Sequence, residues 1–344
     1  MGFSYKNLWQ SVPVVQNAYN GVVMSFSSEK ILPITANQDR SRGCLIGLAV
    51  GDALGTTLEF QPPGTFKPLT DIVGGGHFCL KKGYWTDDTS MALCLGHSLV
   101  ECEGFDARDQ MNKYCDWMNK GYMSSISVCF DVGVGVSSAL RRFQKTGDPY
   151  AGSKARWSSG NGSIMRLAPV PIFYQLSLSD AMEFAAESSR TTHGSELCLD
   201  ACRLLSSILV HLINGGEKHG CFELQYQPQT EEVQLIKSGT FVHKTYSKLT
   251  GSGYVVESLE SALWCFINTE SFESCVLAAA NLGNDADTTA AIAGQLAGAY
   301  YGHSGIRSDW LDVLHMHNDI FALADELFKL SQQVHTEKTT EKSE

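Results

Sequence analysis

The chain has 344 residues, of which 43% are hydrophobic and 18% charged, so its composition excludes a disordered protein. Its formal net charge of −11 argues against nucleic acid as a partner. No apolar run approaches the roughly 18 residues of a membrane span, and no basic segment marks a signal peptide. Eleven cysteines at irregular spacings fit a reducing compartment, so we expect a cytoplasmic protein.

Apolar residues three and four positions apart predict helices along most of the chain, whereas sustained alternation is rare. Met91, Leu95 and Leu99 follow this spacing directly after a Thr-Asp-Asp-Thr run at residues 86–89. That run would begin the helix, because hydroxyls cap helix starts and acids favour their positive end. Further helices are predicted at residues 197–212, 259–267 and 290–299, the last of which is rich in Ala and Gly. The pattern indicates an all-α protein.

Glycine and polar residues cluster between these helices, at residues 74–76, 158–163, 215–216 and 251–253. Such clusters predict loops, which is where a site on a helical scaffold would form. Residues 335–344 are polar and low in complexity, so a frayed tail is expected there.

Two acidic clusters share one design. The Thr-Asp-Asp-Thr run at residues 86–89 and the Asn-Asp-Ala-Asp-Thr-Thr run at residues 284–289 both place carboxylates and hydroxyls before a helix. If folding brings them together, they supply four carboxylates and at least two hydroxyls, the ligand types that Mg²⁺ or Mn²⁺ prefers. The alternative is that each cluster only caps its helix. Both clusters lie beside glycine-rich loops, and gathered carboxylates repel unless a cation neutralises them, which favours the metal site.

An ordered set of motifs resembles the ADP-ribosylglycohydrolase family. It begins with the glycine-rich run at residues 43–55 and Glu59, and continues through residues 86–89 to Gly-Asn-Gly-Ser-Ile-Met-Arg at 160–166. Thr192 and His193 follow, then residues 251–254 and 281–289. The likeness therefore covers roughly residues 40–305.

This resemblance implies an all-α, single-domain fold with a central cleft that holds two divalent ions, Mg²⁺ or Mn²⁺. The residues that match the family's metal ligands are Thr86, Asp87, Asp88, Asp285, Asp287 and Thr288. Glu59 matches an acid near the metals, so Glu59 and Asp287 are the candidates for proton transfer. Without the match, Glu59 would be read as a surface residue.

The resemblance also implies where ADP-ribose lies. Glycine loops let a ligand approach the backbone, whose N–H groups can hold a diphosphate. The residues expected to contact the ligand are Gly133, Gly135, Gly160, Asn161, Gly162, Ser163 and His193. Taken alone, the glycines would be turns and the histidine a structural residue.

The implied function is hydrolysis that removes ADP-ribose from a modified protein side chain. The likeness to bacterial members favours ADP-ribosyl-arginine, with ADP-ribosyl-serine as an alternative. A protein that binds ADP-ribose or another protein without catalysis is a second alternative, and a two-metal phosphoester hydrolase is a third.

Three segments are expected: an N-terminal extension at residues 1–37, the enzyme domain at 38–330 and a polar tail at 331–344. The extension contains Phe3, Trp9, Val15 and Tyr19, which is too apolar for a solvated linker. It would either pack on the core or bind a partner. In the second case the protein would be an immunity protein that opposes an ADP-ribosyltransferase toxin.

Overall fold

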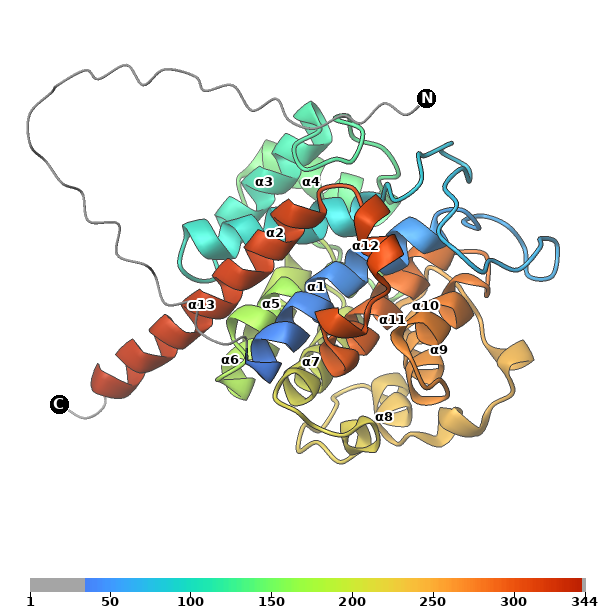
Figure 1. Cartoon of the computed structure of the whole chain (residues 1–344). Helices are drawn as coiled ribbons and strands as arrows, with labels where there is room; N and C mark the ends of the chain where they lie inside the picture. Colours follow the sequence, from blue (N-terminus) through green and yellow to red (C-terminus); the bar gives the residue numbers. More distant parts are fainter. Residues whose placement is uncertain (1–34, 342–344) are drawn as a thin grey trace, which may run out of the picture. The chain divides into compact units, whose positions relative to one another are not determined.

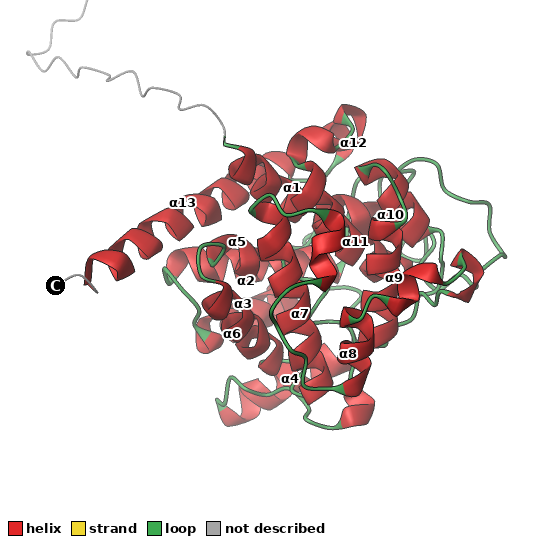
Figure 2. Ribbon diagram, turned by 90° about the horizontal axis from the view of Figure 1, so that it is seen from below, coloured by secondary structure: helices red, strands yellow, loops and turns green. Residues whose placement is uncertain are grey.

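The structure of the protein is a computed structural model that describes residues 35–341, with side chains to residue 336. Within this range the fold is helical, and three isolated bridges are its only β-pairing (Figure 2). The α-helices are α1 (Ala36–Gly55), α2 (Asp87–Glu101), α3 (Ala107–Lys120), α4 (Val134–Thr146), α5 (Pro169–Phe173), α6 (Leu178–Arg190), α7 (Glu196–Ile213), α8 (Glu231–Lys237), α9 (Val255–Ile267), α10 (Phe272–Ala280), α11 (Ala286–Tyr301), α12 (Ser308–Val313) and α13 (His317–Glu341). The predicted all-α class is confirmed, as are the four predicted helices, which correspond to α2, α7, α9 and α11.

Five short 3₁₀ segments lie among the loops: η1 (Arg156–Ser158), η2 (Lys218–Phe222), η3 (Thr240–His243), η4 (Tyr246–Lys248) and η5 (His303–Gly305). No helix among residues 35–341 is both long and apolar enough to cross a membrane. Most of the predicted extension lies outside the described residues. Its last three belong to the helical unit, because Thr35 caps α1 by accepting a bond from the Gln38 backbone N–H.

Helices α1 and α11 pack along each other in the centre of the fold (Figure 1). Gly43, Gly47 and Gly51 stand every fourth residue on α1, so they form a stripe without side chains. This stripe faces the small residues of α11. A methyl group on Gly47 would lie 2.3 Å from the Gly294 carbonyl oxygen, so the two backbones meet. Glycine costs about 1 kcal/mol relative to alanine inside a helix, and the close contact offsets that cost.

Helix α13 crosses α1, α2 and α5, and it replaces the frayed tail that was expected from residue 335 (Figure 1). Leu323 and Leu327 are buried in the core, and Leu330 and Val334 pack partly against it. Because this four-three-four spacing continues to Val334, the polar residues beyond it extend a helix that is already anchored. Residues 335–341 are helical, so the expectation of a frayed tail was wrong for them.

We expect Gly47→Ala to lower the free energy of unfolding by about 3 kcal/mol, because the added methyl group would force two backbones apart. Chemical denaturation followed by circular dichroism measures the change. Gly104→Ala is the matched control, since its methyl group would meet only the Tyr174 hydroxyl at an ordinary 3.6 Å. Equal stability of both variants would contradict the packing account.

Candidate functional site

The starts of α2 and α11 meet in the interior, although 200 residues separate them. The Thr288 hydroxyl lies 3.1 Å from Asp88 Oδ1, and the Thr86 hydroxyl lies 3.3 Å from Asp287 Oδ2. All four side chains are buried. Folding therefore brings the two acidic clusters together, as the sequence analysis expected.

Asp52, on α1, holds the start of α2 in place. Its Oδ1 accepts hydrogen bonds from the backbone N–H and hydroxyl of Thr86, both at 2.9 Å. Its Oδ2 accepts the same pair of bonds from Thr89, at 3.0 and 2.6 Å. Thr86 is the residue at the helix start, yet it makes no side-chain capping bond, so Asp52 performs the capping from a neighbouring helix. No local pattern predicts this role for Asp52, although a lone acid in the apolar run of residues 44–54 is a signal of it.

The loop after α1 places Glu59 beside the acids at the starts of α2 and α11. Its neighbour Phe60 donates a backbone hydrogen bond to the Asn284 carbonyl, and the Asn284 N–H donates to the Gln61 carbonyl, at 2.6 and 2.8 Å. Phe60 and Asn284 both adopt positive φ, at 61° and 55°. Such backbone costs free energy outside glycine, and it is retained here where two loops lock together beside the acids.

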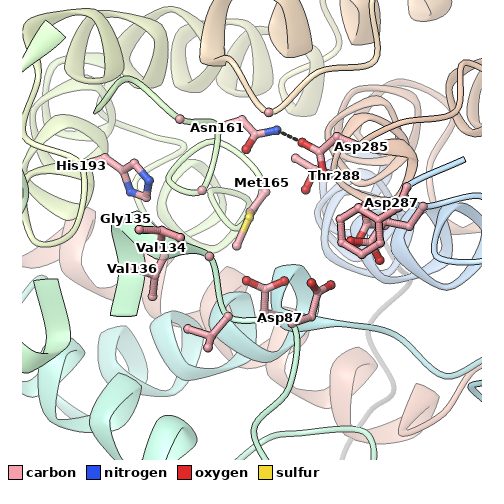
Figure 3. A pocket seen from close by; sticks show the side chains of 18 residues that line it. Asp87, Val134, Gly135, Val136, Asn161, Met165, His193, Asp285, Asp287 and Thr288 are labelled. Carbon is pink, nitrogen blue, oxygen red and sulfur yellow. Dashed lines mark hydrogen bonds between the residues drawn. The ribbon is translucent and has the colours of Figure 1, made fainter. Parts of the chain in front are cut away.

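A cavity of about 410 Å³ opens over these acids (Figure 3). Helix starts and glycine loops form its wall. The residues that line it are Glu59, Phe60, Asp87, Asp131, Val132, Gly133, Val134, Gly135, Val136, Gly160, Asn161, Gly162, Met165, His193, Gly253, Asp285, Asp287 and Thr288.

Asn161 connects the glycine loop to the acids. Its side-chain amide donates to Asp285 Oδ2 at 2.6 Å (Figure 3) and to the Ser258 hydroxyl at 3.1 Å. Its backbone N–H donates to the Gly253 carbonyl, so the loop at residues 159–163 is fixed against the loop at 251–254. A ligand in the cavity would therefore touch both the acids and these loops.

The acids form two groups that share Asp287. Oxygen atoms of Asp52, Asp88 and Asp287 lie within 4.8 Å of one another, and so do those of Glu59, Asp131 and Asp287. Asp131 was not predicted as a site residue. It lies in the glycine loop before α4 and adopts a positive φ of 55°, which is a feature of backbone that sequence patterns do not reveal.

Burial and mutual repulsion both raise the pKa values of these acids. Burial is the larger cause for Glu59, followed by the charge of Asp287, and together with further neighbouring acids they raise its pKa to about 12. Burial raises the pKa of Asp131 to about 7 and that of Asp52 to about 6. The pKa values of Asp87, Asp88 and Asp287 also lie well above the usual range, for the same two reasons.

The donor set fits divalent cations. Asp88 Oδ2, Asp287 Oδ1 and Glu59 Oε2 are buried and have no hydrogen-bond partner in the structure. Buried polar atoms are costly unless a donor or a cation satisfies them, and carboxylate oxygens are the ligands of hard cations. Asp52 differs, because four hydrogen bonds already occupy its oxygens. It is a positioning residue, and the other acids could hold a metal.

Most of the predicted site residues surround this cavity. Thr86 and Asp88 lie beneath its lining, in contact with Asp287 and Thr288. Ser163 differs from its expected role. It is buried, and its hydroxyl accepts a hydrogen bond from Cys202 Sγ at 3.4 Å, so it faces α7 and does not line the cavity.

Within the described part of the chain, fold and site define an all-α protein that gathers buried carboxylates beside glycine loops. A sequence model of the ADP-ribosylglycohydrolase family matches residues 33–337. A solved structure titled ADP-ribosylglycohydrolase-related protein complex is 38% identical, with a TM-score of 0.75 over 86% of this chain and 99% of that one. The chain belongs to the ADP-ribosylglycohydrolase family.

Two named relatives support this family membership. The ADP-ribosylarginine hydrolase Tri1 of Serratia proteamaculans is 40% identical over 303 residues, which cover 88% of this chain and 82% of that protein. The ADP-ribosyl-(dinitrogen reductase) glycohydrolase of Rhodospirillum rubrum is 35% identical, over 81% of this chain and 91% of its own length. The predicted family and the predicted class of enzyme, a glycohydrolase, are confirmed.

We expect Mg²⁺ to raise the unfolding temperature more at pH 8 than at pH 5. Without cations, the raised pKa values of Asp131 and Asp52 mean that the folded chain holds protons that the unfolded chain releases above about pH 4. The stabilisation of the fold by Asp131 and Asp52 in their protonated form is complete below about pH 4 and is lost as the pH rises to about 7. Bound cations replace those protons.

Thermal unfolding with Mg²⁺ or with a chelator, from pH 5 to 8, measures this difference. Asp312→Ala, which alters an exposed acid on α12, should keep the pH-dependent gain. An Mg²⁺ effect of one size at every pH would argue against a cation among these carboxylates.

Proposed function

We propose that the protein hydrolyses the N-glycosidic bond between ADP-ribose and an arginine side chain, using two divalent ions, of which Mg²⁺ is the first candidate. The observation that carries the proposal is the position of Asp287, which belongs to both acid groups and lines the same cavity as the glycine loops. The name of the 40% identical relative, an ADP-ribosylarginine hydrolase, supports arginine as the linkage.

Six residues would hold the ions: Thr86, Asp87, Asp88, Asp285, Asp287 and Thr288. Asn161 orients Asp285 by a 2.6 Å hydrogen bond, and Asp52 fixes Thr86. Divalent ions, when bound, supply positive charge that polarises ribose oxygens and lowers the pKa of a water.

The ligand would lie between the acids and the glycine loops. Gly133, Gly135, Gly160 and Gly162 line the cavity with backbone, which lets a diphosphate or a ribose approach N–H groups closely. Gly133 precedes α4, so the positive end of that helix also faces the cavity. These features suit the negative charge of ADP-ribose.

Proton transfer falls to Glu59 and its neighbour Asp131. Breaking the bond at the anomeric carbon requires a proton on the leaving nitrogen and the removal of one from the attacking water. Glu59, which burial and then the negative charges around it keep protonated, is suited to donate, and an ionised Asp131 is suited to accept. Asp287 is the other candidate for proton transfer, since its carboxylate has an oxygen within 4.8 Å of those of Glu59 and Asp131.

A second role concerns the N-terminal extension. Its aromatic residues, among them Trp9 and Tyr19, are the types that anchor protein interfaces. We propose that it binds an ADP-ribosyltransferase toxin, so that the chain acts as an immunity protein that both erases the modification and holds the enzyme that makes it.

The first test compares proteins that carry ADP-ribose on arginine, serine or an acidic residue. We expect Mg²⁺-dependent release of free ADP-ribose from arginine, and a chelator should stop it. Asp287→Ala should lower the rate by at least about 100-fold. Removing a residue that only supports a metal ligand already lowers activity by about 10- to 100-fold, and Asp287 would bind the metals directly. Asp312→Ala is the matched control. Release from serine alone would overturn the linkage, and release of phosphate would point to a phosphoesterase.

The second test removes the extension before Thr35, which must stay because it caps α1. The shortened chain should hydrolyse at the rate of the full chain but bind a purified ADP-ribosyltransferase toxin poorly. In the full chain, Trp9→Ala should weaken that binding by about 2 kcal/mol, whereas Asp287→Ala should leave it intact. If the shortened chain loses stability and activity together, the extension packs on the core instead.

A further inference from the structure

Three side chains behind the cavity form a hydrogen-bonded chain that the reaction described above does not use. Arg166 Nη2 donates to the Thr192 hydroxyl oxygen at 2.7 Å, and that oxygen lies 2.9 Å from His193 Nδ1. All three are buried, and only His193 reaches the cavity. These hydrogen bonds therefore connect the buried guanidinium group of Arg166 to the imidazole ring of His193, which faces the cavity.

Arg166, at one end of this series of hydrogen bonds, is held in place by two further contacts. Its guanidinium group lies 4.6 Å from the centre of the Tyr114 ring, and its Nη1 lies 3.6 Å from Met91 Sδ. A guanidinium group can only donate hydrogen bonds, and it stays charged in proteins. The Thr192 oxygen must therefore accept from Arg166.

The direction of the second bond follows from the single proton of the Thr192 hydroxyl. Within residues 35–336, Arg166 and His193 are the only side-chain partners of this oxygen. If His193 Nδ1 carried a proton, it too would donate to Thr192, and the buried hydroxyl proton would have no acceptor, which is costly. The lower-energy arrangement has Thr192 donate to an unprotonated Nδ1. A neutral imidazole then carries its proton on Nε2.

The Nε2 edge of His193 faces the glycine loop at residues 160–162 and the first turn of α4. A methyl group on Gly135 would lie 3.2 Å from Nε2, one on Gly162 3.1 Å and one on Gly160 3.5 Å. Among the described residues no hydrogen bond reaches Nε2, although His193 is 5% exposed. A nitrogen without a partner, on a ring that is otherwise almost fully buried, thus points into the cavity.

We propose that Arg166 and Thr192 are positioning residues that fix His193 as the Nε2–H tautomer, so that it offers a neutral donor to an oxygen of the ligand, either diphosphate or ribose hydroxyl. The ligand's identity rests on the proposed function, whereas the tautomer does not. Burial, and secondly the charge of Arg166, lower the pKa of His193 to about 3. At neutral pH the ring therefore orients the ligand and exchanges no proton with it.

The tautomer can be read directly in the full chain with Mg²⁺. Long-range ¹H–¹⁵N spectra of protein labelled at its ten histidines distinguish a protonated Nε2 from a protonated Nδ1, and His193→Gln assigns the signals. We expect a protonated Nε2 and a bare Nδ1 at pH 7, and free ADP-ribose should shift the Nε2 signal. A protonated Nδ1, alone or in an imidazolium, would overturn the proposal.

Two variants of Thr192 separate this role from general packing. Thr192→Val keeps the shape but removes the hydroxyl, so the Nε2–H signal should be lost or mixed. Affinity for free ADP-ribose should then fall about tenfold, the effect of one hydrogen bond. Thr192→Ser should restore both. An unchanged tautomer in Thr192→Val would overturn the relay, and if that variant does not fold, the spectrum of the unaltered protein decides alone. Failure to release ADP-ribose from any linkage would instead contradict the proposed function.

Discussion

The close contact between α1 and α11 is the constraint on which the site depends. Because glycines on α1 meet the backbone of α11, the two helices approach more closely than larger side chains would allow. Asp52 on α1 then reaches the start of α2, while Asp287 at the start of α11 reaches Thr86. The end of α1 and the starts of α2 and α11 are thereby held together around the acids. A scaffold with a looser contact here would separate the acids, whatever their spacing in the sequence.

That point concentrates negative charge in the interior, which is normally unfavourable. Burial and repulsion raise the pKa values of the acids, so without cations the folded chain must take up protons or tolerate repulsion. The scaffold offsets part of this cost with donors: four hydrogen bonds reach Asp52 and one from Asn161 reaches Asp285. Asp88, Asp287 and Glu59 keep bare oxygens, and the carboxylates of Asp88 and Glu59 each have an oxygen within 4.8 Å of one of Asp287. The free-energy cost of burying carboxylates without partners therefore falls on the residues that would bind a cation.

Much of the site was predictable because its chemistry is local in sequence. Acids and hydroxyls before helix starts identified Asp87, Asp88, Asp285 and Asp287, and the all-α class followed from apolar spacing. Other features depend on contacts between distant segments, which no local pattern records. Asp52 acts on a helix that starts more than 30 residues later, and Asp131 joins the acids through a loop with positive φ. Ser163 belongs to the predicted loop, yet the turn directs its hydroxyl toward α7. The helix beyond Val334 could not be predicted from apolar spacing, because the residues that follow are polar and only extend a helix anchored before them.

Two cations in one cavity, both held by Asp287, are what the proposed function requires. Crystals grown with Mn²⁺ and measured at a wavelength where manganese scatters anomalously test this claim most directly, since the ions then appear independently of any assay. We expect two anomalous peaks, both in contact with Asp287 and each also in contact with others of the six proposed ligands, Asp88 among them. A single peak, or peaks that Asp287 does not touch, would contradict it.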